Sequence, residues 1–160
     1  MAVGPAMSGD CALRLATLAD EAEVDEFLRA VDMGISGDIC EHVLLHEDGE
    51  LLGVAKFTPV RAQEYHLDTL AIRADRKGSG LGSLLLKRLL AAPWECFDGY
   101  EAVPAYTVTT ISRGTAVPFY RKFGFVPCDF ADIHWQFVDQ CDSCPVRAEC
   151  DPQPMLCRKG

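Results

Sequence analysis

The chain has 160 residues, of which 24 are acidic and 15 are Lys or Arg, so its formal net charge is −9. This length suits one domain with a proper core, and the apolar share of 49% is typical of a globular protein. The negative charge argues against a general nucleic-acid binder, because neutralising phosphates needs a surplus of basic residues. No apolar run could span a bilayer, and the start MAVGPAMSGD lacks the features of a leader. We therefore expect a cytoplasmic protein that binds neither nucleic acid nor membranes.

The first half of the sequence predicts a strand, a helix and an antiparallel meander. Residues 1–10 show no hydrophobic period and are expected to form a flexible arm. Alternation at 12–16 predicts a strand, and apolar residues at helical spacing up to Val31 predict a helix after it. The runs 42–46 and 51–57 flank an Asp-Gly pair, which favours a tight hairpin. A further run at 65–72 completes the meander.

The second half alternates helices with strands until residue 140. A helix is expected from Leu81, a strand at 105–110, a short helix at 115–122, and strands near 125–128 and 133–138. From Cys141 onward Cys, Pro, Asp and Arg replace any hydrophobic period. We therefore expect an arm at 1–10, a domain at 11–140, and an appended cysteine-rich tail at 141–160 that something other than a core holds together.

A glycine-rich turn joins the strand that ends at Ile72 to the helix that begins at Leu81. It reads Lys77-Gly78-Ser79-Gly80-Leu81-Gly82-Ser83. Glycines let main-chain N–H groups converge on an anion, and a following helix adds unpaired donors and the positive end of its dipole. A pyrophosphate would fit such a turn, although a purely structural turn is the alternative. The spacing matches neither the Walker pattern nor the dinucleotide-binding GxGxxG, which would need Gly or Ala at Ser83.

Two motifs in order resemble those of the GNAT family of N-acetyltransferases. KGSGLG, between LAIRADR and SLLLKRLL, is similar to the family's loop for the pyrophosphate of acetyl-CoA, with Lys77 where Arg or Gln is usual. AVPFYRKFGF at 116–125 resembles the family's aromatic-Tyr helix and its Gly-Phe turn, although Arg113 stands where Asn is frequent. The resemblance covers roughly residues 12–138. It implies an α/β fold with a mixed, mainly antiparallel sheet, splayed in its middle and flanked by helices, and acetyl-CoA as co-substrate. The cofactor-binding residues that it implies are Leu70, Ala71, Ile72, Lys77, Gly78, Ser79, Gly80, Leu81, Gly82 and Ser83.

Acetyl transfer needs a deprotonated amine, a polarised carbonyl and a proton for the leaving thiolate. The resemblance implies that a backbone N–H of the strand before the loop, that of Ile72, binds the carbonyl. It also assigns the proton for the thiolate to Tyr120, the Tyr of the aromatic-Tyr pair. A core tyrosine is the alternative interpretation of this residue.

The family's usual base is a carboxylate four residues before the Leu-Ala-Ile segment, and His66 occupies that position here. Asp68 lies two residues on, so strand alternation places both side chains on one face. We therefore expect His66 and Asp68 to take part in proton transfer. A histidine on the surface of a strand edge is the alternative interpretation of His66. Glu41, Glu64 and His42 are further polar residues, of which Glu41 and His42 start a strand that often borders the acceptor groove in the family.

The tail arranges Cys141, Cys144, Cys150 and Cys157 in a C-x2-C-x5-C-x6-C pattern. Four thiolates at such spacing can form a tetrahedral zinc site, and CPVRAEC is also similar to the cysteine segment of WhiB-like iron-sulfur regulators. The tail as a whole resembles that of short GNAT proteins related to N-acetylglutamate synthase, including Met155. We predict structural zinc, with free or regulatory thiols, an ordered tail without metal, and an iron-sulfur cluster as alternatives.

The expected partner is a small primary amine or an amino acid, because the chain shows no extra module for gripping a macromolecule. A homodimer is compatible with the sequence. Two alternatives belong to other classes: a catalytically weak acyl-CoA-binding module that senses thiols or metal, and an enzyme that acetylates proteins.

Overall fold

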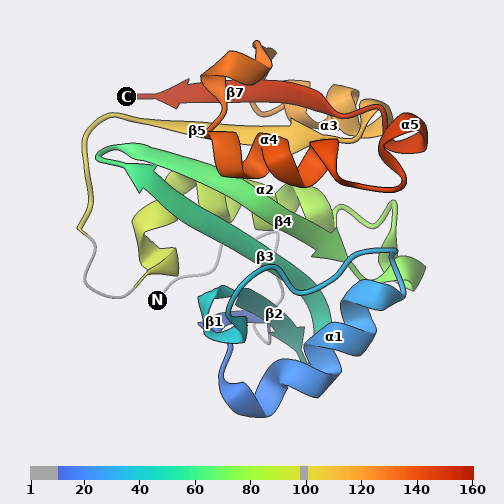
Figure 1. Cartoon of the computed structure of the whole chain (residues 1–160). Helices are drawn as coiled ribbons and strands as arrows, with labels where there is room; N and C mark the ends of the chain where they lie inside the picture. The colour runs from blue at the N-terminus through green and yellow to red at the C-terminus, as the bar shows by residue number, and fades with distance from the viewer. Residues whose placement is uncertain (1–10, 98–100) are drawn as a thin grey trace. The chain divides into compact units, whose positions relative to one another are not determined.

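The computed structural model describes residues 11–97 and 101–160. The described residues group into two compact units. The first contains residues 11–57, 69–97, 101 and 102, and the second contains residues 58–68 and 103–160. The strands β3 and β4 both run through the two units (Figure 1).

The structure contains strands and helices in mixed order. The strands are β1 Cys11–Leu15, β2 Val43–Glu47, β3 Glu50–Arg61, β4 Glu64–Ile72, β5 Tyr106–Ser112, β6 Val126–Pro127 and β7 Gln153–Lys159. The helices are α1 Glu21–Arg29, α2 Leu81–Ala91, α3 Val117–Arg121, α4 Trp135–Asp142 and α5 Arg147–Cys150. No helix among residues 11–97 and 101–160 has the length and apolar character required to cross a membrane.

Hydrogen bonding orders the strands as β1-β2-β3-β4-β5-β7-β6. β1 and β2 pair antiparallel, as do β2 with β3, β5 with β7, and β6 with β7. β4 and β5 pair in parallel over a short register that runs from Glu64↔Thr107 to Leu67↔Thr110. This mixed, mainly antiparallel α/β sheet confirms the expected fold class.

The β2–β3 hairpin forms where Asp-Gly predicted it. Asp48 (φ 52°) and Gly49 (φ 79°) both take the left-handed conformation that a two-residue turn between paired strands requires. The hairpin contributes to the core of the first unit, in which Val24 and Leu28 of α1 pack with Leu44 and Val54. Helix formation in α1 therefore follows from its apolar stripe.

Within the expected cysteine-rich tail at 141–160, residues Gln153–Lys159 form the strand β7. β7 lies between β5 and β6 in the sheet. Met155 and Cys157 on it are 0% and 2% exposed. Pro154 and Met155 pair with Ile111 and Thr110 in the antiparallel β5–β7 ladder. Strand pairing and the burial of Met155 and Cys157 therefore hold β7 in place. The expected strand at 133–138 is wrong, since α4 begins at Trp135.

Replacing Met155 with alanine tests whether β7 belongs to the core. We expect Met155→Ala to lower the free energy of unfolding by about 2–5 kcal/mol, because a fully buried methionine leaves a cavity. Arg158→Ala, at an exposed position of the same strand, should change it by no more than about 0.5 kcal/mol. Denaturant titration followed by circular dichroism measures both. Equal, small effects of the two variants would contradict the assignment.

Candidate active site

The glycine-rich turn has the geometry of an anion cradle. Gly78 and Gly80 have φ of 81° and 86°, and Gly80 is the residue that precedes α2. Residues 77–80 are exposed, and an added side-chain carbon at either glycine would meet nothing within 4 Å. The first N–H groups of α2, from Leu81 onward, have no partner within the helix. These donors, together with the helix dipole, can hold a pyrophosphate at this turn.

The arginines next to the turn are engaged by carboxylates. The Arg73 guanidinium pairs with Asp75 at 2.9 Å and also with Glu50, and Arg76 lies 3.6 Å from Glu47. These ion pairs neutralise most of the positive charge that the sequence places near the loop. Anion binding at the turn must therefore rely chiefly on main-chain N–H groups and on Lys77.

The end of β4 presents N–H groups on the side opposite β3. Arg73 N donates to the Leu52 carbonyl at 2.9 Å, which fixes the direction of that N–H towards β3. Successive N–H groups of a strand alternate in direction, so those of Ile72 and Leu70 point away from β3. The register with β5 has already ended at Leu67. The Ile72 N–H is thus oriented as a donor for a ligand that follows β4.

Tyr120 lies in α3, in an aromatic cluster of the second unit. Its ring meets Phe119 and Phe125 edge-on, with centroids 5.3 and 5.4 Å away. Burial raises the pKa of Tyr120 to about 12, and a hydrogen bond with the Thr110 hydroxyl opposes that rise. The phenol is therefore protonated at neutral pH, as a proton donor must be.

His66 is a buried residue of β4. It is 3% exposed, its ring stacks on Phe137 of α4 at 3.8 Å, and its Nδ1 forms a 2.9 Å hydrogen bond with Thr109 Oγ1. Burial, and secondarily the nearby His134, lower the pKa of His66 to about 3. The imidazole is therefore neutral at physiological pH and a weak proton acceptor.

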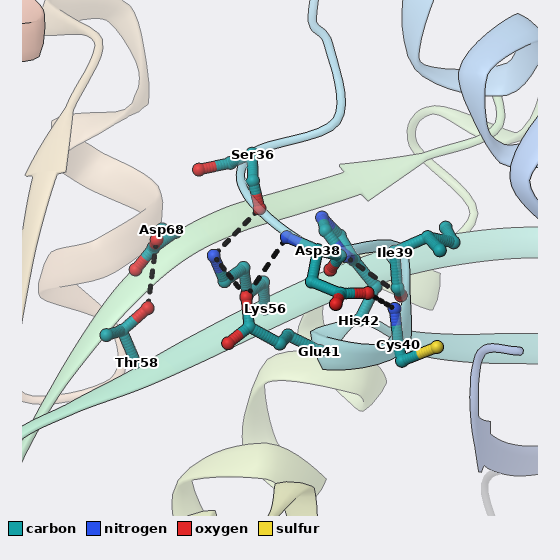
Figure 2. A network of polar contacts seen from close by, with 9 residues as sticks. All are labelled: Ser36, Asp38, Ile39, Cys40, Glu41, His42, Lys56, Thr58 and Asp68. Carbon is teal, nitrogen blue, oxygen red and sulfur yellow. Dashed lines mark hydrogen bonds and ion pairs between the residues drawn. The ribbon is translucent and has the colours of Figure 1, made fainter. Parts of the chain in front are cut away.

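Asp68 is more accessible than His66. The side chain is half-buried, and its Oδ2 accepts a 3.0 Å hydrogen bond from Thr58 Oγ1 (Figure 2). The two residues therefore differ in their environment on β4. His66 is a buried, neutral imidazole, whereas Asp68 is a half-buried acidic side chain.

A polar network in the first unit surrounds Lys56, which belongs to none of the sequence motifs. Its side chain is 8% exposed, and Nζ donates to the Ser36 carbonyl at 2.7 Å and lies 3.4 Å from Oε1 of the exposed Glu41 (Figure 2). The available signal was a lone lysine inside the apolar run LLGVAKF.

His42 belongs to the same network. It is fully buried, and its Nδ1 faces the carbonyl oxygens of Asp38 and Ile39 at 3.0 and 3.2 Å. Its Nε2 has no hydrogen-bond partner among residues 11–97 and 101–160. Nδ1 therefore carries the proton, and burial lowers the pKa of the ring. Glu41 Oε1 also accepts from the Asp38 N–H at 3.2 Å, which ties this turn to Lys56.

The four predicted cysteine ligands do not form a site among the described residues. Residues 11–97 and 101–160 contain no group of three or more His, Cys, Asp or Glu side chains that could hold a metal ion. Cys157 lies on β7, where its thiol meets the Phe123 carbonyl at 3.6 Å. Burial raises the pKa of the Cys141 thiol, and the nearby Arg147 opposes that rise. As the structure places them, these four cysteines do not fit a four-thiolate metal centre.

Comparison with protein families identifies residues 38–127 as an acetyltransferase (GNAT) domain. This match covers more than half of the chain and includes both the glycine-rich turn and Tyr120. The chain therefore belongs to the GNAT family of N-acetyltransferases, whose acyl donor is acetyl-CoA. Comparison of the sequence with curated proteins gives no match.

Solved structures share the fold at low sequence identity. N-acetylglutamate synthase from Neisseria gonorrhoeae, complexed with coenzyme A and N-acetyl-glutamate, matches with a TM-score of 0.73 and 16% identity over 96% of this chain. This chain spans only 36% of that synthase. A Mycobacterium tuberculosis protein in complex with CoA matches with a TM-score of 0.66 and 14% identity over 91% of this chain and 98% of its own. The ribosomal-protein-S18-alanine N-acetyltransferase of Escherichia coli matches with a TM-score of 0.64 and 16% identity over 94% of each chain.

The burial of His66 predicts a pH-dependent stability. The unfolded chain binds a proton at this histidine below about pH 6.5, whereas the folded chain resists protonation down to about pH 3. Stability should therefore fall as the pH falls from about 6.5 towards 3, with up to about 1.4 kcal/mol per pH unit from this group. His66→Gln should flatten that slope in urea unfolding, while His42 still contributes in the same direction.

The partly exposed His134 provides a control. His134→Gln removes only the secondary cause of the shift, so it should change the slope much less than His66→Gln. An unchanged slope in His66→Gln would contradict the burial of a neutral imidazole at this position.

Proposed function

We propose that the protein transfers the acetyl group of acetyl-CoA to a primary amine by direct attack through a tetrahedral intermediate. The supporting observation is the exposed turn Gly78–Gly80, which leads into α2 and follows, after residues 73–77, a strand whose Ile72 N–H points away from β3. The turn would hold the pyrophosphate of CoA, and the Ile72 N–H would donate to the acetyl oxygen.

In the proposed reaction the neutral amine attacks the thioester carbon, and negative charge develops on the acetyl oxygen. A donor already oriented at that oxygen stabilises the charge without reorganisation. The C–S bond then breaks, and the CoA thiolate takes the proton of the Tyr120 hydroxyl. An alkyl thiol titrates near 8.5, so protonation assists its departure at neutral pH.

The amine must lose a proton before or during the attack. Because burial holds the pKa of His66 at about 3, His66 is the weaker candidate for this proton. We assign the acceptance of the proton to the half-buried carboxylate of Asp68, directly or through a water molecule. His66, on the same strand as Asp68, then contributes by packing its ring against Phe137 of α4.

The central test is free-thiol release from acetyl-CoA with a panel of amino acids, polyamines and peptides. Tyr120→Phe should lower kcat by about 100-fold at pH 7, and the deficit should shrink above about pH 9, where the thiolate leaves without a proton. Gly80→Ala should weaken CoA binding in calorimetry, because residue 80 needs a positive φ and lies in the cradle.

Two outcomes of the panel would redirect the assignment. CoA binding without turnover on any acceptor would favour an acyl-CoA-binding or thiol-sensing module. Turnover restricted to peptide N-termini would favour protein acetylation, the activity named for the Escherichia coli structural neighbour.

The Lys56 network supports an amino-acid acceptor. A zwitterionic amino acid offers a carboxylate and an amine, and the network presents the complementary pair, the Lys56 ammonium and the exposed Glu41 carboxylate. The ammonium is largely buried, where its interaction with a second carboxylate would be weakly screened. A carboxylate-bearing acceptor is therefore proposed over a simple amine.

Matched acceptors separate this specificity from general activity. Lys56→Met should raise KM for the carboxylate-bearing acceptor at least tenfold and leave KM for acetyl-CoA unchanged, whereas Lys56→Arg should restore part of the loss. The comparison uses an amino acid and its decarboxylated counterpart, such as lysine and 1,5-diaminopentane. An equal loss for both members of the pair, or a loss of thermal stability that accounts for it, would exclude Lys56 as the carboxylate contact.

A further inference from the structure

Through its hydroxyl, Thr110 takes part in two hydrogen bonds, one with Leu67 and one with Tyr120. It is 2% exposed and forms, with Leu67, the last pair of the parallel β4–β5 register. Its Oγ1 donates to the Leu67 carbonyl at 3.0 Å, and the same hydroxyl is a hydrogen-bond partner of Tyr120. One side chain thus joins the end of the strand pairing to the phenol of α3.

A hydroxyl has a single proton and two acceptor lone pairs. While that proton is directed to the Leu67 carbonyl, Thr110 can only accept the hydrogen bond from the neutral Tyr120 phenol. If Tyr120 loses its proton, rotation about one C–O bond turns the Thr110 proton from the carbonyl to the phenolate. The arrangement therefore provides a bond to Tyr120 in both of its protonation states.

The phenolate needs such a donor. The ring of Tyr120 is surrounded edge-on by Phe119 and Phe125, which offer no hydrogen bond. Burial raises the pKa of Tyr120 to about 12, whereas an alkyl thiol titrates near 8.5. Proton transfer to the thiolate is uphill by that difference, so a hydrogen bond that strengthens as negative charge forms lowers the barrier.

We propose that Thr110 is a positioning residue for the leaving-group acid: it holds the Tyr120 hydroxyl in place and donates to the phenolate that forms as Tyr120 protonates the CoA thiolate. The inference rests on the proposed function and adds a residue to it. The O–H bond of Tyr120 breaks and an S–H bond forms on CoA, while Thr110 keeps its own proton. The phenolate then takes a proton from water before the next turnover.

The strand itself does not require the hydroxyl. Val108, two residues earlier in β5, is fully buried, and valine suits a strand as well as threonine does. Thr109 supplies a matched control, because it is 3% exposed and its hydroxyl bonds His66 rather than Tyr120. Thr110→Val and Thr109→Val therefore each remove one buried hydroxyl from adjacent positions of one strand.

The experiment measures thiol release and the titration of Tyr120 in these variants. Thr110→Val should lower kcat about 10- to 100-fold at pH 7, the range expected for a lost hydrogen bond to a charged group. Both KM values should stay within about twofold of the wild type, and Thr110→Ser should recover most of kcat. The absorbance of tyrosinate, taken as the difference from Tyr120→Phe, should show a higher pKa for Tyr120 in Thr110→Val and no change in Thr109→Val.

A double variant separates coupling from packing. In the Tyr120→Phe background, Thr110→Val should cost little further activity, since the acid it serves is absent. Additive losses of kcat in the double variant would overturn the inference, and so would equal losses of kcat in Thr110→Val and Thr109→Val. In either case a defect in Tyr120→Phe would still support the proposed function. An unaltered kcat in Tyr120→Phe would overturn both. Thr110→Ala takes the place of the valine variant if circular dichroism shows that the latter does not fold.

Discussion

The unequal pairing of β4 along its two edges is the constraint on which the candidate site depends. Towards β3 the hydrogen bonding continues as far as Arg73, while the register with β5 ends at Leu67. Main-chain N–H groups without partners are costly when they are removed from water. The last residues of β4 therefore hold donors in a fixed direction, ready for a ligand that runs along the strand. A pantetheine chain with a thioester at its end meets that requirement.

The arginines near the glycine-rich turn are also engaged within the protein. The chain is strongly acidic, and Arg73 and Arg76 are paired with Glu47 and Glu50 of the β2–β3 hairpin and with Asp75, which precedes the turn. An anion at Gly78–Gly80 would therefore interact mainly with main-chain N–H groups, the dipole of α2 and Lys77, and less with the paired arginines. Such a site selects for shape and for hydrogen-bond geometry more than for total negative charge.

Local signals allowed the first half of the fold, the glycine turn and α2 to be predicted from the sequence. Asp-Gly determines a hairpin, and glycines before an apolar helix determine the turn, whatever the rest of the chain does. β7 was not predicted, because Pro154 and Cys157 obscure the alternation of apolar and polar residues. Its place in the sheet also depends on pairing with the distant strand β5. The burial of His66 and its lowered pKa were not predicted either, because they too depend on a distant segment of the chain. Its low pKa depends on Phe137 of α4, and the sequence pattern of α4 suggested a strand.

The position of β7 in the sheet has a consequence for how the second unit assembles. β5 pairs along its length with β7, yet α3, β6, α4 and α5 lie between them in the sequence. The long intervening loop must close before this ladder can form, which slows folding compared with the local β2–β3 hairpin. Until then one edge of β5, with its buried threonines, lacks its partner. Chaperone binding or aggregation during synthesis would act at that stage.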